Sequence, residues 1–222
     1  MMQKAKLSLA ALLMIAALPA LQGCVEAALL GTAAAASVMS AHDRRSTGTQ
    51  TDDETMEWKS NNHVPAQYKD HSHVNFTAFN RRVLITGEVP NEEAKSSIES
   101  EIRKIEGVRD VINELGIGPA TPLGSRSNDS FITSKVKARL VDTNQLSANH
   151  IKVLSERGIV YLMGIVNERE SKVAIAVART TAGVVKVVNV MEIVSDDETR
   201  RLDNQVLGAR SAPPQSAPVE NR

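Results

Sequence analysis

Cys24 is the only cysteine in the 222-residue chain, so its thiol is the single side chain that offers sulfur nucleophile chemistry. An internal disulfide is therefore excluded. The residue follows a short apolar segment, Leu7 to Leu21, which itself follows the cations Lys4 and Lys6. A run of this length is typical of a signal peptide, because a membrane-spanning helix needs about 20 apolar residues. We expect export, with cleavage beside this cysteine.

The four residues Leu21-Gln22-Gly23-Cys24 resemble the lipobox of bacterial lipoproteins, although Gln22 departs from the small or aliphatic residue usual at its position. The resemblance implies removal of residues 1–23 and a diacylglyceryl thioether on the cysteine thiolate. Two or more acyl chains anchor a protein stably, at about 0.8 kcal/mol per buried CH₂. Val25 in place of Asp implies sorting to the outer membrane, so we expect a lipid-anchored protein that faces the periplasm. The alternative is a free thiol after an ordinary signal.

A second set of residues is suited to an acidic lipid surface. Three apolar residues at i, i+4 and i+8 predict the buried face of a helix: Ile132, Val136 and Leu140. Four residues fall together on another face: Phe131, Lys135, Ala138 and Arg139. A ring with nearby cations suits a helix on an anionic bilayer, where each cation contributes about 1 kcal/mol. Lys137 lies to the side. The pattern alone favours the plainer alternative, in which Phe131 packs against a neighbouring element and the cations are merely solvated.

Other reactive side chains have simpler explanations. His71 and His73 share a face of a strand and are placed to grip a metal, but no third ligand stands near them in the sequence, so we predict no metal site. Glu92 and Glu93 occupy a first helical turn, where the helix dipole favours negative charge. Ser155 has no evident base or acid partner, and the chain shows neither a nucleophile elbow nor a phosphate loop. We therefore predict no catalytic residues and no cofactor.

The elements that must position these residues are clearest in the second half of the chain. The pattern predicts the order α-β-β-α-β: a helix starting near 128–130, strands at 151–154 and 159–163, a helix from Asn167 to Gly183, and a strand at 184–194. The turn Glu156-Arg157-Gly158 predicts an antiparallel hairpin. The strand-helix-strand unit should be parallel and right-handed. We expect an α+β fold: a three-stranded mixed sheet with two helices on one face.

The first half repeats this plan. Val83-Leu-Ile-Thr-Gly87 aligns with Val160-Tyr-Leu-Met-Gly164, and Gly107-Val-Arg-Asp-Val-Ile-Asn113 aligns with Gly183-Val-Val-Lys-Val-Val-Asn189. Repeats this long are duplicated domains rather than stacked solenoid units. We expect the two strand glycines to allow a bulge or positive φ, and the two asparagines to satisfy backbone groups.

We place the first domain at residues 51–117 and the second at 128–195, with a Pro/Gly/Ser linker at 118–127. Residues 24–50 are expected to form a flexible tether, and 196–222 a largely disordered tail. The opening helix of the first domain should be short or irregular, because three residues interrupt its pattern: Asn61, Asn62 and Pro65.

Charge differs between the two domains. Without residues 1–23 the chain holds 24 basic and 26 acidic residues, a net charge of −2, which argues against a nucleic-acid partner. Residues 51–117 hold 8 basic and 13 acidic residues, a net charge of −5, whereas residues 128–195 hold 9 and 6, a net charge of +3. An anionic surface should therefore meet the second domain.

The repeated glycines, the Gly-Val turns, the Val-Ile-Asn113 and Val-Val-Asn189 strands and the segment from Ser127 to Leu140 resemble the BON domain, a small periplasmic module. With the lipobox, residues 51–194 resemble outer-membrane lipoproteins that carry two such domains. The resemblance implies binding to anionic phospholipid (phosphatidylglycerol or cardiolipin) through the first helix of the second domain. It also implies a role in envelope integrity and cell division. The alternative is a scaffold that docks on an envelope assembly protein, with lipid serving only as a tether.

Overall fold

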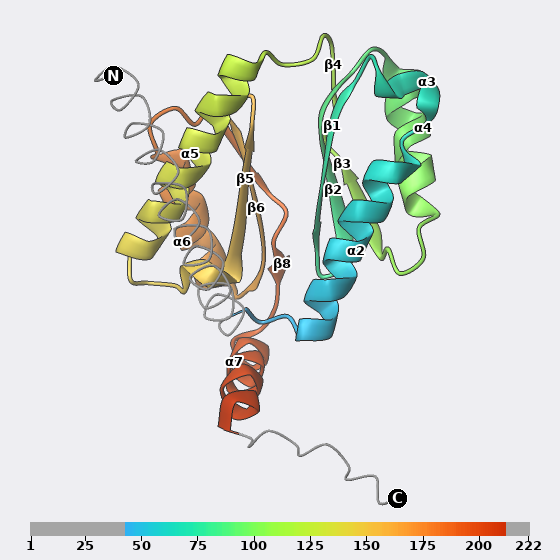
Figure 1. The fold of residues 1–222 in the computed structure, drawn as a ribbon. Helices are drawn as coiled ribbons and strands as arrows, with labels where there is room; N and C mark the ends of the chain where they lie inside the picture. The colour runs from blue at the N-terminus through green and yellow to red at the C-terminus, as the bar shows by residue number, and fades with distance from the viewer. Residues whose placement is uncertain (1–42, 212–222) are drawn as a thin grey trace, which may run out of the picture. The chain divides into compact units, whose positions relative to one another are not determined.

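Two α-β-β-α-β modules follow each other in the computed structural model, which describes residues 43–211 (Figure 1). Cys24 and the predicted signal peptide, residues 1–23, lie outside the described residues. The first domain contains α2 (Thr47–His63), α3 (Ala66–Lys69), β1 (His73–Phe79), β2 (Arg82–Val89), α4 (Glu92–Arg103), β3 (Asp110–Asn113) and β4 (Gly116–Ile117). The second contains α5 (Leu123–Asp142), η1 (Ala148–His150), β5 (Ile151–Glu156), β6 (Ile159–Val166), α6 (Glu168–Arg179), β7 (Lys186–Asn189) and β8 (Glu192–Ile193), and α7 (Asp196–Ser211) follows it.

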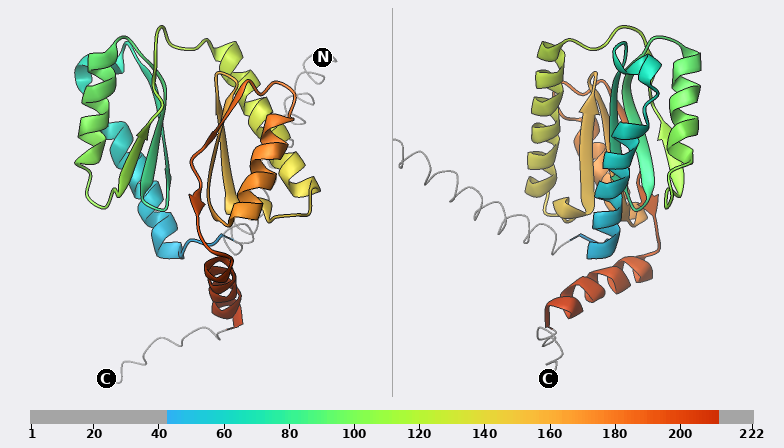
Figure 2. Two further views of the ribbon diagram at one scale, coloured as in Figure 1. Left: turned by 180° about the vertical axis from the view of Figure 1, so that it is seen from behind. Right: turned by 45° about the vertical axis from the view of Figure 1, so that its right-hand side comes forward.

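Both sheets have the predicted mixed topology. The hairpin strands pair antiparallel, β1 with β2 and β5 with β6, and the strand after the second helix pairs parallel to the inner hairpin strand. Figure 2 shows α5 and α6 on one face of the second sheet. The α+β fold with two tandem domains is confirmed.

The last strand of each domain is interrupted and forms two short segments, β3 and β4 in the first domain and β7 and β8 in the second. The side-chain oxygen of Asn113 accepts the backbone N–H of Leu115, and that of Asn189 accepts the N–H of Met191. The predicted role of both asparagines, to satisfy backbone groups, is confirmed. Each strand then resumes as a short second segment against the same neighbour, β4 on β2 and β8 on β6.

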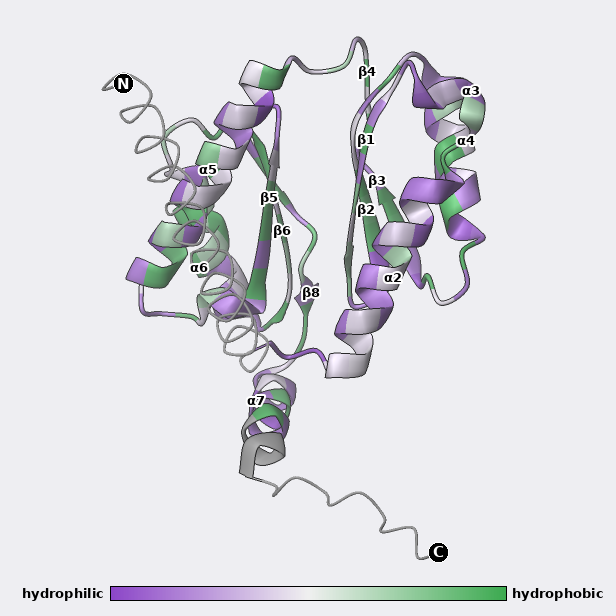
Figure 3. Cartoon of the chain, in the orientation of Figure 1, coloured by the Kyte–Doolittle hydropathy of each residue, from purple (hydrophilic) through white to green (hydrophobic). Residues whose placement is uncertain are grey.

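Each domain has its own hydrophobic core between the helices and the sheet. Apolar residues concentrate on the strands and on the helix faces that meet them (Figure 3). Fully buried residues of the first core include Val83, Ile98 and Ile102. The predicted helix face of the second domain is confirmed, because three side chains of α5 are at most 1% exposed: Ile132, Val136 and Leu140.

Gly87 and Gly164 lie on β2 and β6 where the neighbouring backbone approaches too closely for any side chain. A Cβ on Gly87 would lie 1.9 Å from the carbonyl oxygen of His73, and one on Gly164 would lie 2.4 Å from that of His150. Gly87 also has the expected positive φ, +111°. Gly164 does not, so its requirement comes from the close contact alone.

The prediction of an irregular first helix is wrong, because α2 is a regular helix of 17 residues. Ser46 caps its start, where the hydroxyl accepts the N–H of Thr49, so the helix begins inside the segment expected to be tether. Asn61 and Asn62 lie in its last turn, where their amides donate to the carbonyls of Glu57 and Trp58. Pro65 lies beyond its end and precedes α3. The three residues expected to interrupt the helix therefore lie at or just beyond the carboxyl end of α2.

The predicted linker, residues 118–127, is only partly irregular, because α5 already begins at Leu123. Pro122 directly precedes the helix and Arg126 donates to the carbonyl of Thr121, which closes the first turn. Asp129, which stands at the predicted start of this helix, lies inside it, is 4% exposed and accepts the backbone N–H groups of the hairpin turn between β5 and β6.

The prediction of a disordered tail from residue 196 is wrong over its first part, since α7 occupies Asp196–Ser211. Three acidic residues in its first turn are favoured by the helix dipole: Asp196, Asp197 and Glu198. Thr199 is 3% exposed, so the helix also packs on the rest of the chain. Among the helices of residues 43–211, none is long and apolar enough to cross a bilayer.

Candidate functional site

The side of α5 that faces away from the sheet carries an uncharged stripe. Its exposed members recur every three or four residues along the helix: Leu123, Ser127, Phe131, Ser134, Ala138 and Val141. Three are large and apolar, and their side chains are 74%, 62% and 61% exposed in the order Leu123, Phe131 and Val141. The stripe is about 27 Å long at 1.5 Å per residue. We call these six residues the α5 stripe.

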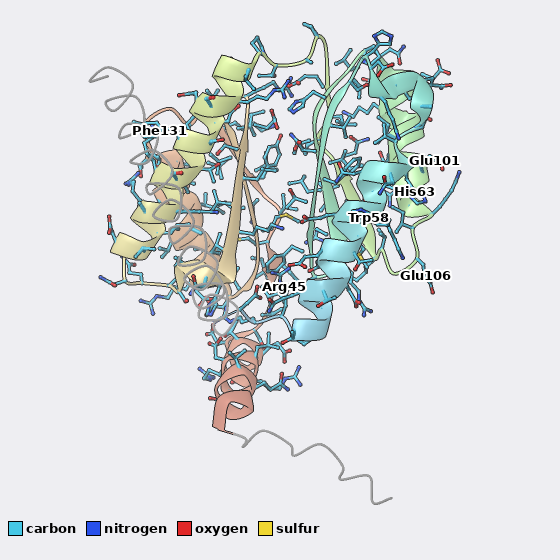
Figure 4. All side chains as sticks on the ribbon, in the orientation of Figure 1. Arg45, Trp58, His63, Glu101, Glu106 and Phe131 are labelled. Atoms are coloured by element: carbon cyan, nitrogen blue, oxygen red, sulfur yellow. The ribbon has the colours of Figure 1, made fainter. Side chains whose placement is uncertain are left out.

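Phe131 projects from α5 on the side turned away from the strands (Figure 4). Its exposure disfavours the alternative in which the ring packs against a neighbouring element. Sequence reasoning found Phe131 and Ala138 but missed Leu123, which was placed in the linker, and Val141. The signal was available, because the same spacing of three or four residues continues in both directions from Phe131.

The two predicted cations are less free than expected. Lys135 lies over the Phe131 ring, 4.7 Å from its centre, and its ammonium also donates to the carbonyl of Ala182. Arg139 donates to the carbonyl of Val177 at 3.0 Å and to two threonine hydroxyls near the end of α6. Both cations thus join α5 to the carboxyl end of α6, where carbonyl groups favour positive charge.

Lys137 borders the stripe on its other side. It is exposed, and within residues 43–211 its ammonium has no ion-pair partner. Lys137, which the sequence pattern placed to the side of the predicted lipid-contact residues, is therefore the cation of α5 most available to an external anion.

A further exposed apolar residue lies in the turn that follows α6. Val185, in the turn between α6 and β7, is 81% exposed, and its N–H donates to the carbonyl of Gly158. Gly183 in the same turn lies against Lys135. Phe131, Lys135 and Val185 therefore lie around one end of the second domain.

His73 meets two acidic residues that are distant in the sequence. Its Nδ1 lies 3.3 Å from Glu88, and ligand atoms of His73, Glu88 and Glu156 all fall within 4.8 Å of one another. His71 is exposed and takes no part in this group. The sequence offered no third ligand because the carboxylates come from β2 and β5, which only the folded chain brings beside β1.

Arg44 binds the start of the described chain to the second domain and to α7. Its guanidinium, with a side chain 3% exposed, pairs with Glu170 at 2.7 Å and with Asp203 at 2.7 Å. Burial alone would lower the pKa of Arg44, but the hydrogen bonds to Asp203 and Glu170 raise it above its ordinary value. Burial, with Arg44 nearby, lowers the pKa of His150 beside this pair.

Comparison with known proteins agrees with the duplicated fold. A family model described as the BON domain matches residues 52–119 and 128–195. The outer membrane lipoprotein DolP of Haemophilus influenzae is 41% identical over 174 residues, which cover 78% of this chain and 89% of that protein. A protein named 21 kDa hemolysin, from Actinobacillus pleuropneumoniae, is 36% identical over 154 residues, which cover 68% of this chain and 79% of that protein. The chain therefore belongs to the BON domain family and carries two copies of the domain.

Proposed function

We propose that this protein is an outer-membrane lipoprotein, anchored through Cys24 and facing the periplasm, that lays α5 on an anionic phospholipid surface. The observation that carries the proposal is the α5 stripe, which exposes Leu123, Phe131 and Val141 along one side of a helix. The similarity to an outer membrane lipoprotein supports the anchor and the location. A contribution to envelope integrity and cell division is part of the same proposal.

The magnitudes suit a reversible membrane contact. Full burial of a Val, Leu or Phe side chain contributes roughly 1.5–3 kcal/mol, and each cation near an anionic surface adds about 1 kcal/mol. Partial insertion of three apolar side chains beside Lys135 and Lys137 therefore supports a dissociation constant roughly between millimolar and micromolar. Such an affinity is weak for a free protein and sufficient for one already held at the membrane by acyl chains.

The test is co-sedimentation of residues 24–222 carrying Cys24→Ser with phosphatidylglycerol-containing and purely zwitterionic vesicles, at low and moderate salt. The fragment must include Arg44, since this residue holds α7 and the second domain. We expect selective binding to the anionic vesicles that weakens with salt.

A triple variant with serine at positions 123, 131 and 141 should lose about tenfold or more of this binding, since 1.4 kcal/mol corresponds to tenfold. The matched control is Trp58→Ser, which removes a 69% exposed aromatic side chain from the first domain. Equal binding by the triple variant and wild type would contradict the proposal.

A second candidate function is protein docking through α2. Trp58 projects from this helix on the acidic first domain, and tryptophan is enriched where protein interfaces concentrate their binding energy (Figure 4). In that case Trp58→Ser would abolish crosslinking to an envelope protein, while anionic vesicles would fail to bind the unlipidated wild type.

A further inference from the structure

A buried polar group joins the two domains at the end of β5. His73 lies on β1, Glu88 on β2 directly opposite in register, and Glu156 on β5 of the second domain. The Nδ1 atom of His73 and the Oε2 atom of Glu88 are 3.3 Å apart, and one ligand atom from each of the three residues lies within 4.8 Å of the others. One imidazole and two carboxylates thus converge from segments 15 and 68 residues apart.

The two carboxylates are unequally compensated. Glu88, 2% exposed, accepts both the N–H and the hydroxyl of Thr121, and the Nε of Arg157 lies 3.4 Å from its Oε1 atom. Glu156 is 5% exposed, and within the described part of the chain its hydrogen-bond donor is the neutral amide of Asn75, at 3.0 Å.

Negative charge is therefore in excess around Glu156. The Glu88 carboxylate belongs to the same group, and Asp129 lines the same cavity as Glu156. Two carboxylates in a poorly solvated place repel each other unless a cation lies between them or one takes a proton. A cation bound beside Glu156 would offset the repulsion between the two carboxylates.

A cavity gives a cation access to this point. Its volume is about 520 Å³, and His73, Asn75 and Glu156 line it together with Asp129 and Ser155. A hydrated ion can therefore reach the imidazole and the Glu156 carboxylate and retain water on its open side.

The group is not a requirement of the fold. The repeat places His150 at the position of His73, with the carbonyls of both residues against a strand glycine. The position of Glu88, however, is taken by Ile165 in the second domain. The sheet of the second domain thus folds without a carboxylate at the equivalent position, so Glu88 is particular to the first domain.

We propose that His73, Glu88 and Glu156 bind a divalent transition-metal cation at the junction of the two domains. Imidazole nitrogen with carboxylate oxygens is a donor set that suits Zn²⁺, with water completing the coordination. Because the ligands come from both domains, the bound ion stabilises the chain as a whole, in proportion to its occupancy.

The test is equilibrium dialysis of untagged, unlipidated protein (residues 24–222 with Cys24→Ser) against Zn²⁺ at neutral pH, with thermal unfolding measured in parallel. Wild type should take up one tight Zn²⁺ per chain, and its Tm should rise with Zn²⁺ concentration. Glu156→Gln and His73→Gln should each weaken this binding by about tenfold or more and remove the rise in Tm. His71→Gln, which changes an exposed histidine two residues away, should match wild type.

Circular dichroism of each variant without metal tests whether the variant is folded. A loss of Zn²⁺ binding can then be distinguished from a loss of structure. The proposal is overturned if wild type takes up no tightly bound Zn²⁺. It is equally overturned if Glu156→Gln and His73→Gln, both folded, retain wild-type affinity.

Discussion

At the scale of single residues, the close approach of β1 to β2 requires glycine at position 87. Gly87→Ala would place a Cβ against the His73 carbonyl in a left-handed backbone conformation, so we expect a loss of at least about 2 kcal/mol in the free energy of unfolding. Gly124→Ala is the control, because nothing lies within 4 Å of its added methyl group and alanine favours a helix. Urea unfolding distinguishes them, and similar midpoints for both variants would contradict the close approach.

Glu156 predicts a pH dependence of the opposite sign to that of most carboxylates. Burial raises its pKa in the folded state, so its contribution to stability is full below the unfolded pKa and is lost as pH rises through the folded pKa. In the presence of EDTA, Glu156→Gln should therefore be more stable than wild type at neutral pH, with the difference vanishing on acidification below the pKa of a free Glu.

The control for this pH series is Glu168→Gln. Lys172 lowers the pKa of exposed Glu168, so its small effect runs the other way and is lost as pH falls. Unfolding free energies of each variant and of wild type, measured across the acid range, show whether the stability difference grows or shrinks as pH falls. A Glu156→Gln variant less stable than wild type at neutral pH would show that the carboxylate is compensated after all.

At the scale of elements, α7 depends on one arginine from the opposite end of the described chain. Arg44→Met would leave Glu170 buried without its partner and Asp203 without its anchor, at a cost of about 3–5 kcal/mol. Hydrogen exchange of the α7 amides should accelerate strongly. Arg200→Met, which removes an exposed cation on α7 itself, should leave exchange almost unchanged. Slow exchange in the Arg44 variant would mean that other contacts hold the helix.

Elements that depend on local signals were predictable from the sequence. Asn167 caps α6 and Gly183 follows it with a positive φ, as the predicted helix bounds required, and Asn91 and Gly107 do the same for α4. Apolar periodicity also located the buried face of α5. These features succeed because each is decided by a few neighbouring residues.

The misplaced elements depend on partners far along the chain. α7 contains residues typical of a polar tail, and its packing involves Arg44, 159 residues from Asp203. The hairpin turns show the same limit. Asp53 and Asp129 are buried helix residues, and each accepts two N–H groups from the turn of its own domain's hairpin. A sequence shows that an aspartate is present but not which turn it will meet.

At the scale of the whole molecule, the two sheets share an apolar contact. Its buried members come from both domains: Phe79, Leu84, Tyr161, Met163, Ile165 and Val190. Ion pairs cross at its border, including Lys152 with Glu57 at 2.7 Å and Arg109 with Glu192 at 2.5 Å. All described residues belong to one compact unit, so the domains should unfold together.

This coupling predicts that a destabilising substitution in one domain also lowers the stability of the other domain. Leu140→Ala opens a cavity in the second core and should cost about 2–5 kcal/mol. Hydrogen exchange of β2, in the first domain, should then accelerate by the same factor as that of β6. Ile98→Ala provides the reciprocal experiment from the first core. Acceleration confined to the mutated domain would show that the two unfold independently.

The Arg44 contact also sets how far the second domain can travel from a lipidated Cys24. Only 19 peptide units separate Cys24 from Asp43, which limits the reach to about 65 Å even for a fully extended chain. A domain confined within that radius of a bilayer experiences an effective concentration of at least about 3 mM at the membrane. A stripe whose Kd is near 1 mM would then be engaged most of the time, yet would release and rebind quickly. Attachment would be permanent, while the orientation of the protein on the membrane would remain adjustable by changes in lipid charge.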